Sequence, residues 1–157
     1  MSVYRKILVP IDGSPTSRRG LIEAIKLAKD QHATLRLVHV LDELMLGPGA
    51  EAAIYVGTVD MLRDAGKQLV AAAEKAAGES GLKAESVILE IMGGRAADAI
   101  VSEARTCGAD LIVLGTHGRR GAKRLVMGSD AEEIVRTATV PVLLVRSGAG
   151  AGDLHNP

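Results

Sequence analysis

Short, β-branched apolar runs alternate with longer amphipathic stretches along the whole chain, and this alternation is the feature that most limits its fold. The apolar runs predict strands over residues 4–11, 34–41, 84–92, 109–115 and 140–146. Helical periodicity predicts helices over residues 15–31, 58–80, 95–107 and 129–138. Strands that alternate with helices form parallel sheets joined by right-handed crossovers. The sequence therefore predicts an α/β fold with one open parallel sheet.

Capping and breaking residues mark several of these boundaries. Ser14 suits an N-cap, and Pro15 suits the first position of a helix. Ser129 and Glu132 form a Ser-x-x-Glu capping box at the start of the last helix. Pro141 cannot donate a ladder hydrogen bond, which places the last strand at an edge or at a pairing boundary.

Two stretches lie outside the alternating pattern. Residues 42–57 hold three glycines and a proline with weak periodicity, and we expect a long loop there with room for one helical turn. Residues 148–157 are rich in glycine and predict a flexible tail. Residues 1–147 are then expected to form a single domain.

Composition and charge exclude several classes of protein. The chain has 157 residues, enough for one domain with a real core, and its apolar runs are far shorter than the roughly 20 residues of a membrane helix. It has 19 basic and 19 acidic residues, so no net field attracts polyanions, and with two Tyr and no Phe or Trp it offers little for base stacking. Nucleic acid is therefore a poor partner. The lone Cys107 excludes an internal disulfide and agrees with a cytoplasmic location.

Polar residues and glycines follow two of the predicted strands. Asp12-Gly13-Ser14 comes after the first strand, and Gly115-Thr116-His117-Gly118 comes after the fourth. In a doubly wound sheet of order 3-2-1-4-5 these strands are neighbours at the point where the strand order reverses. Open α/β sheets bind their ligands at that point, so the two segments are predicted to face one crevice.

The second segment begins a glycine-rich loop with features of a phosphate site. Gly115, Gly118 and Gly128 precede Ser129, and glycine lets backbone N–H groups approach a phosphate closely. A helix that begins at Ser129 adds exposed N–H groups and the positive end of a helix dipole. Four basic residues also lie in the loop: Arg119, Arg120, Lys123 and Arg124. The same residues fit an ordinary strand-to-helix turn with solvated charges, so both interpretations remain open.

Other chemistries find less support in the residues. No G-x-G-x-x-G follows the first strand and no G-x-x-x-x-G-K-[ST] occurs, which argues against the usual dinucleotide fold and against a P-loop. His117 has no visible partner that would make it a general base. His39 is predicted to be a partly buried strand residue, and Asp12 also fits a plain helix-start residue.

The opening ILVPIDGSPTS, the spacing Gly115-x2-Gly118-x9-Gly128-Ser129 and the ending VPVLLVR resemble the universal stress protein family over about residues 3 to 147. The glycine pattern is that of the family's ATP-binding branch. The resemblance implies a Rossmann-like, five-stranded parallel sheet flanked by four helices, a homodimer through the last strand, Val140 to Val145, and bound ATP with room for Mg²⁺. The ATP site that it implies comprises Pro10, Ile11, Asp12, Val40, Gly115, Thr116, His117, Gly118, Arg119, Gly128, Ser129 and Asp130.

Asp130 departs from the family pattern, which usually has a small or apolar residue there. A carboxylate repels phosphates unless it points away or meets a cation, although it suits a helix N-terminus. We expect a cytoplasmic ATP-binding protein that acts as a homodimeric stress-response or signalling module. The alternatives are a slow ATPase or autophosphorylating enzyme that uses the same pocket, and a ligand-free dimeric adaptor, against which the glycine motif argues.

Overall fold

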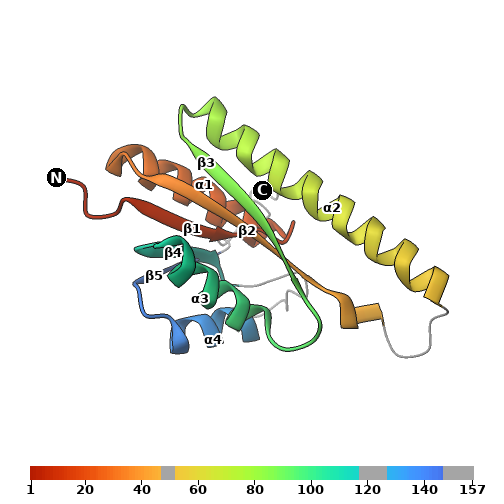
Figure 1. The fold of residues 1–157 in the computed structure, drawn as a ribbon. Helices are drawn as coiled ribbons and strands as arrows, with labels where there is room; N and C mark the ends of the chain where they lie inside the picture. Colours follow the sequence, from red (N-terminus) through yellow and green to blue (C-terminus); the bar gives the residue numbers. More distant parts are fainter. Residues whose placement is uncertain (47–51, 117–126, 147–157) are drawn as a thin grey trace, which may run out of the picture.

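Strands and helices alternate in the computed structural model (Figure 1), which describes residues 1–46, 52–116 and 127–146. The elements in chain order are β1 (Lys6–Pro10), α1 (Pro15–Gln31), β2 (Thr34–Asp42), the 3₁₀ turn η1 (Glu43–Leu46), α2 (Ala52–Glu79), β3 (Ala84–Ile91), α3 (Ala96–Cys107), β4 (Leu111–Gly115), α4 (Ser129–Thr137) and β5 (Val142–Val145). The strands pair in parallel in the order β3-β2-β1-β4-β5. The predicted fold class and strand order are therefore confirmed.

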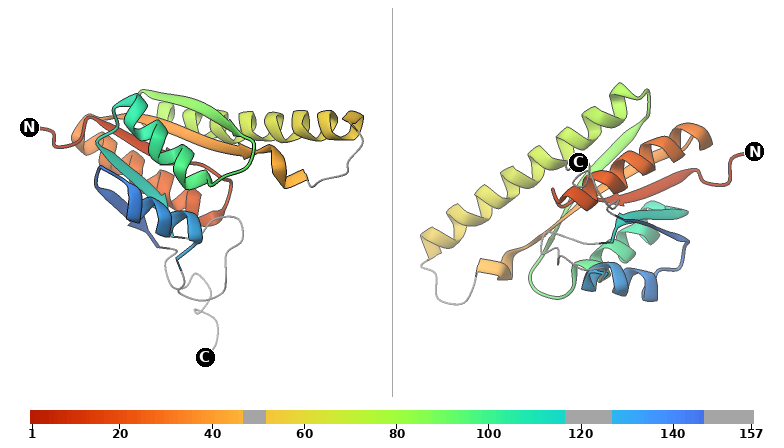
Figure 2. Two further views of the ribbon diagram at one scale, coloured as in Figure 1. Left: turned by 60° about the horizontal axis from the view of Figure 1, so that its bottom comes forward. Right: turned by 180° about the vertical axis from the view of Figure 1, so that it is seen from behind.

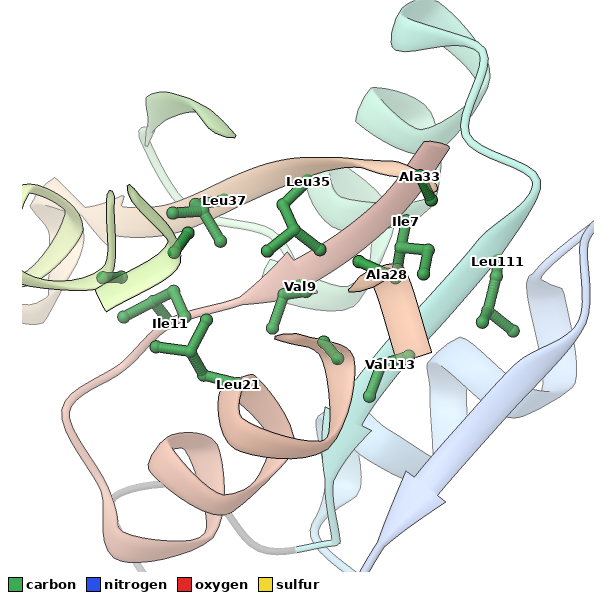
Figure 3. Close-up of a cluster of buried hydrophobic side chains, with 13 residues drawn as sticks. Ile7, Val9, Ile11, Leu21, Ala28, Ala33, Leu35, Leu37, Leu111 and Val113 are labelled. Carbon is green, nitrogen blue, oxygen red and sulfur yellow. The ribbon is translucent and has the colours of Figure 1, made fainter. Parts of the chain in front are cut away.

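The central strand β1 is covered on both faces, as its unbroken apolar sequence predicts. Ile7, Leu8 and Val9 have no exposed surface. Ile7 and Val9 belong to a core with α1 and α2, which Figure 3 shows, and Leu8 belongs to a second core with α3 and α4. The two helix pairs thus lie on opposite faces of the sheet (Figure 2). Full burial of such a side chain stabilises the fold by about 1.5–3 kcal/mol, so β1 anchors both layers.

Helix α1 begins and ends where its residue types predict. The Ser14 hydroxyl accepts a hydrogen bond from the Ser17 N–H at 3.1 Å, and Pro15 occupies the first turn. The helix ends at His32, which is left-handed with φ of 55°. Helix α3 ends in the same way at Gly108, where φ is 69° and glycine avoids a side-chain clash.

The prediction of a long loop over residues 42–57 is wrong for most of the stretch that the structure describes. Residues 43–46 form η1, and α2 begins at Ala52 rather than at residue 58. The first turns of α2 extend beyond the strands (Figure 2), and Ile54 and Val56 are 61% and 58% exposed. Because this part of the helix has no core beneath it, its sequence shows no apolar stripe.

Strand β5 forms one edge of the sheet, as Pro141 predicts. It is shorter than the predicted 140–146, because Pro141 precedes the ladder and contributes only its carbonyl, which accepts from the Ile112 N–H at 3.0 Å. Leu143 is 41% exposed on this edge strand. The predicted tail at 148–157 lies outside the described residues.

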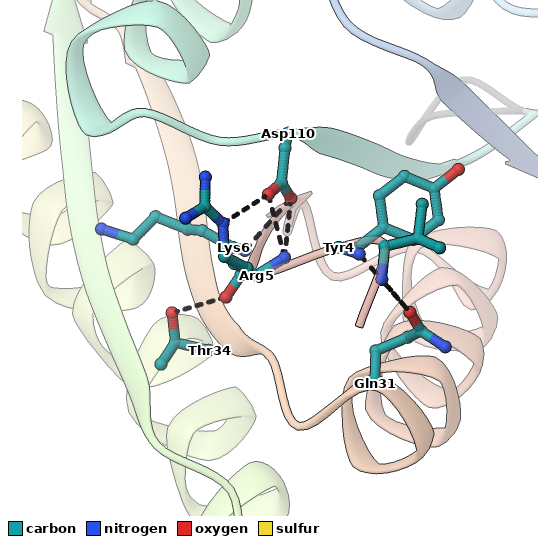
Figure 4. A network of polar contacts seen from close by, with 7 residues as sticks. Tyr4, Arg5, Lys6, Gln31, Thr34 and Asp110 are labelled. Carbon is teal, nitrogen blue, oxygen red and sulfur yellow. Dashed lines mark hydrogen bonds and ion pairs between the residues drawn. The ribbon is translucent and has the colours of Figure 1, made fainter. Parts of the chain in front are cut away.

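A polar network ties the start of the chain to the amino ends of the strands (Figure 4). The Asp110 carboxylate accepts hydrogen bonds from the backbone N–H groups of Arg5 and Lys6 at 2.9–3.1 Å. The Gln31 side chain accepts from the Val3 N–H at 2.8 Å. This network stabilises the sheet at the end opposite the predicted crevice. Within the three described ranges, no helix is both long enough and apolar enough to cross a membrane.

Candidate functional site

The candidate site lies at the carboxyl ends of β1 and β4, where the strand order reverses. After β1 the chain makes a tight turn around Asp12, whose Oδ1 accepts a hydrogen bond from the Ser14 N–H at 2.8 Å. The Asp12 N–H donates to the Ser17 hydroxyl at 3.1 Å, and that hydroxyl donates to the Pro10 carbonyl at 3.3 Å. These bonds hold Asp12 at the carboxyl end of β1, beside the first turn of α1.

Glycine at position 115 lets β4 end directly against that first turn. A Cβ at Gly115 would lie 2.6 Å from both the carbonyl carbon and the oxygen of Thr16. A Cβ at Gly20, one turn further along α1, would lie 3.2 Å from the Gly115 nitrogen. The close approach therefore requires glycine at 115 and favours it at 20, and it brings the end of β4 against the first turns of α1.

The N-terminus of α4 lies beside the end of β4. The Gly128 N–H donates to the Thr116 carbonyl at 2.7 Å, and the Thr116 N–H donates to the Val145 carbonyl at 3.0 Å. Thr116 is buried, with 8% of its surface exposed. The first turn of α1, the end of β4 and the start of α4 thus lie next to one another.

The predicted capping box at Ser129 is wrong. Gly128 is the N-cap, with extended backbone angles, and Ser129 is already the first helical residue. The Gly128 carbonyl accepts the first helical hydrogen bond, from the Glu132 N–H at 3.0 Å, so the helix starts one residue earlier than the capping box predicts. Among the described residues no side chain caps α4. Ser129 and Asp130 are exposed on its first turn, where free N–H groups carry the positive end of the helix dipole.

Val40 borders the crevice through its backbone. The Ile11 N–H donates to the Val38 carbonyl at 2.7 Å. The backbone N–H and C=O of Val38 therefore face the β1 side of the sheet. Peptide orientation in a strand repeats every second residue, so the N–H and C=O of Val40 face the same side. Strand β1 has already ended there, at Pro10. The Val40 side chain packs against the core under α3 and α4.

Part of the predicted site lies outside the described residues. His117, Gly118 and Arg119 fall in the range 117–126, as do the other basic residues of the loop, Arg120, Lys123 and Arg124. Within the described ranges, no three side chains of His, Cys, Asp or Glu come together as a metal site.

Two residues near the carboxyl ends of β1 and β4, Thr16 and His39, were not among the predicted site residues. Thr16 supplies the backbone against which Gly115 packs, and a glycine at the end of a strand gives no sign of which backbone it meets. His39 was expected to be partly buried, but it is only 6% exposed, and its Nδ1 lies 2.7 Å from the Ile11 carbonyl oxygen. Its place in the sequence, one residue before the predicted site residue Val40, could have marked His39 as a neighbour of the site.

In the part of the chain that the structure describes, the contacts that shift pKa values join α2 to β3 and to η1. A hydrogen bond from the Arg63 guanidinium lowers the pKa of Glu90, and the same bond raises the pKa of Arg63. Desolvation, together with the hydrogen bond to Glu43, raises the pKa of Tyr55. These pairs support the long helix rather than the crevice.

The arrangement of the sheet and its helices recurs in known proteins. The sequence profile of the Universal stress protein family matches residues 3–146. The chain is 35% identical to universal stress protein MJ0531 of Methanocaldococcus jannaschii, over 92% of this chain and 84% of that one. It is 34% identical to universal stress protein YxiE of Bacillus subtilis, over 92% and 100% of the two chains.

Solved structures give the same result. A universal stress protein family member from Burkholderia pseudomallei superposes with a TM-score of 0.75 at 33% identity and covers 94% of this chain and 99% of that one. The MJ0577 protein superposes with a TM-score of 0.83 at 25% identity and covers 94% and 99%. With its profile, its relatives and its strand order all in agreement, this chain belongs to the universal stress protein family.

Proposed function

We propose that this chain binds an adenine nucleotide, ATP foremost, in the crevice between the carboxyl ends of β1 and β4. The observation that carries the proposal is the convergence of three backbone segments, around Asp12, Gly115 and Gly128, where strand order reverses. Residues 1–147 form the binding domain in this proposal. It works in the cytoplasm as a homodimeric stress-response or signalling module.

Phosphate groups fit the part of the crevice beside α4. The first N–H groups of that helix follow Gly128 and carry partial positive charge, which suits an anion. The exposed hydroxyl of Ser129 adds a donor on the same turn. Asp130 stands next to it, so its carboxylate either repels the phosphates or meets a cation that they bring. Mg²⁺ would then be held chiefly by the nucleotide's phosphates, as is usual for this ion.

The adenine base fits beside Val40. A base edge presents one donor and one acceptor, and the backbone N–H and C=O of Val40 offer the matching pair past the end of β1. Two universal stress proteins that share this fold were solved with cAMP and, from Archaeoglobus fulgidus, with dAMP, at TM-scores of 0.66 and 0.65. At 24% and 24% identity they support the common fold, and their ligands make adenine nucleotides the first class to test.

The homodimer in this proposal forms through β5. This strand ends the sheet with Leu143 exposed and Val142 and Val145 half-buried. An apolar edge strand exposes unpaired backbone groups unless another chain or element covers it. Pairing with a second copy about a two-fold axis closes both edges at once.

The decisive experiment is nucleotide analysis of the purified protein. With two Tyr and no Trp the chain absorbs weakly near 280 nm, so a co-purified adenine nucleotide will dominate its ultraviolet spectrum. We expect nucleotide to be released on denaturation, and calorimetry to show tighter binding of ATP than of GTP. Folded protein that releases no nucleotide and binds no ATP would refute the proposal. Phosphate release, followed in the same samples, separates binding from turnover.

A further inference from the structure

His39 lies buried under helix α2, directly behind the candidate site. It is 6% exposed and shares its face of β2 with Leu35 and Leu37, which pack in the core under α1 and α2. Its Nδ1 lies 2.7 Å from the carbonyl oxygen of Ile11. A carbonyl oxygen only accepts hydrogen bonds, so Nδ1 carries the proton and donates. The bond therefore fixes the tautomer of the ring.

Helix α2 touches this ring at a glycine. A Cβ at Gly66 would lie 2.7 Å from His39 Cδ2 and 3.1 Å from Nε2. Real Cβ atoms do not come that close, so any larger residue at 66 must displace the ring. The ring is 6% exposed, so the core surrounds it. Gly66 thus lets α2 pack onto the imidazole and hold it in place.

The imidazole forms a hydrogen bond to the first residue after β1. Strand β1 ends at Pro10, and the next residue, Ile11, is held on both sides. The Ile11 N–H donates to the Val38 carbonyl at 2.7 Å, and the Ile11 carbonyl accepts from His39 at 2.7 Å. That carbonyl belongs to the peptide group that leads into Asp12. The imidazole therefore contacts the peptide group that leads directly into Asp12.

We propose that His39 is a positioning residue for the nucleotide site, which fixes the backbone at Asp12 through the Ile11 carbonyl, and that Gly66 sets the position of its ring. This inference rests on the proposed adenine nucleotide site. It joins the long helix α2 to the crevice by a chain of direct contacts, from Gly66 to His39 to Ile11 to Asp12.

The test compares a variant that loses the donor with one that keeps it. His39→Leu fills the space but cannot donate, whereas His39→Asn carries an amide N–H near the position of Nδ1. We expect His39→Leu to weaken ATP binding about three- to tenfold in calorimetry, the effect of one neutral hydrogen bond. We expect His39→Asn to restore most of that loss. Leu35→Val, on the same face of the same strand, serves as the control that lowers stability without affecting the affinity.

A second pair of variants tests the contact from the helix side. Gly66→Ala pushes on the ring and should weaken ATP binding. Gly78→Ala, in the same helix with nothing within 4 Å of the new Cβ, should leave it unchanged. If His39→Leu does not fold, the two glycine variants still decide the matter.

Nuclear magnetic resonance gives a readout that does not depend on ligand. His39→Leu and Gly66→Ala should shift the backbone amide of Asp12, and Leu35→Val and Gly78→Ala should not. An unchanged Asp12 amide, or equal ATP affinity of His39→Leu and the parent, would overturn the inference. A parent protein that binds no adenine nucleotide, with the Asp12 shifts as expected, would instead refute the proposed function and leave the positioning contact in place.

Discussion

Substitution of Gly115 by Ala tests the contact on which the whole crevice depends. The new Cβ would lie 2.6 Å from the Thr16 carbonyl group, and it must reach at least 3.0 Å, so α1 and β4 have to separate by about 0.4 Å. Both partners are backbone, which no side-chain rotation relieves. Overpacking of this kind costs about 1–3 kcal/mol, and alanine recovers about 0.4–1 kcal/mol by restricting the unfolded chain. We expect a net loss of about 1–2 kcal/mol, with weaker nucleotide binding.

Urea unfolding and calorimetry measure the two effects separately. The midpoint of Gly115→Ala should fall by roughly 0.5–1 M at an unchanged m-value, for a slope of about 2 kcal/mol per molar urea. Gly78→Ala is the matched control, because its Cβ meets open space in a helix; its stability should stay equal or rise by up to about 1 kcal/mol. A Gly115→Ala protein as stable as the parent, with the same ATP affinity, would show that the close approach of α1 and β4 does not shape the site.

Three further predictions follow from the described contacts. Leu143→Arg should convert the proposed dimer to monomer in light scattering at micromolar concentration, while a parent that is already monomeric would contradict the β5 interface. Gly128→Val should weaken ATP binding more than Ser129→Ala, whose loss should stay near tenfold, the value of one hydrogen bond to a charged group; the thermal midpoint without ligand shows how much of either loss is stability. Arg63 lowers the pKa of Glu90, so that pKa should return toward its ordinary value in Arg63→Gln. A nuclear magnetic resonance titration that follows the carboxyl carbon of Glu90 measures the change. The pKa of Glu90 is lower in the folded than in the unfolded protein, so the pair stabilises the fold above about pH 4.3, the usual pKa of Glu. This stabilisation is lost as the pH falls through the folded pKa. Equal loss of stability in acid for the parent and Arg63→Gln would contradict the prediction.

The start of helix α2 shows where sequence patterns fail. A helix is recognised by the apolar stripe that it buries, and the first turns of α2 bury little: Ile54, Val56 and Met61 are all more than half exposed. Gly57 in the same stretch further favours a loop. Downstream, Val70, Ala73 and Ala77 face the core, and there the predicted helix is confirmed. The pattern therefore located the part of the helix that packs on the sheet and missed the part that does not.

The site was predictable where it depends on strand ends and not where it depends on packing between elements. Asp12, Gly115 and Gly128 follow from strand boundaries and glycine spacing, and the structure brings their segments together. The start of α4 depends on which carbonyl accepts the first helical hydrogen bond: it is that of Gly128, whereas the Ser-x-x-Glu pattern indicates Ser129. The contact of Gly66 with His39 joins residues from two separate elements, so only the folded chain shows it.

The central position of β1 has a consequence for synthesis on the ribosome. Its partner β4 emerges late, since the linked residues Lys6 and Asp110 are 104 positions apart. At about 5–20 residues per second, β1 waits roughly 5 to 20 s with one edge unpaired, although β2 can already pair with its other edge and β3 with β2. Such an open apolar edge recruits other strands. Nascent chains arrested before residue 111 should therefore bind chaperones or aggregate, and chains that extend past β5 should do so far less.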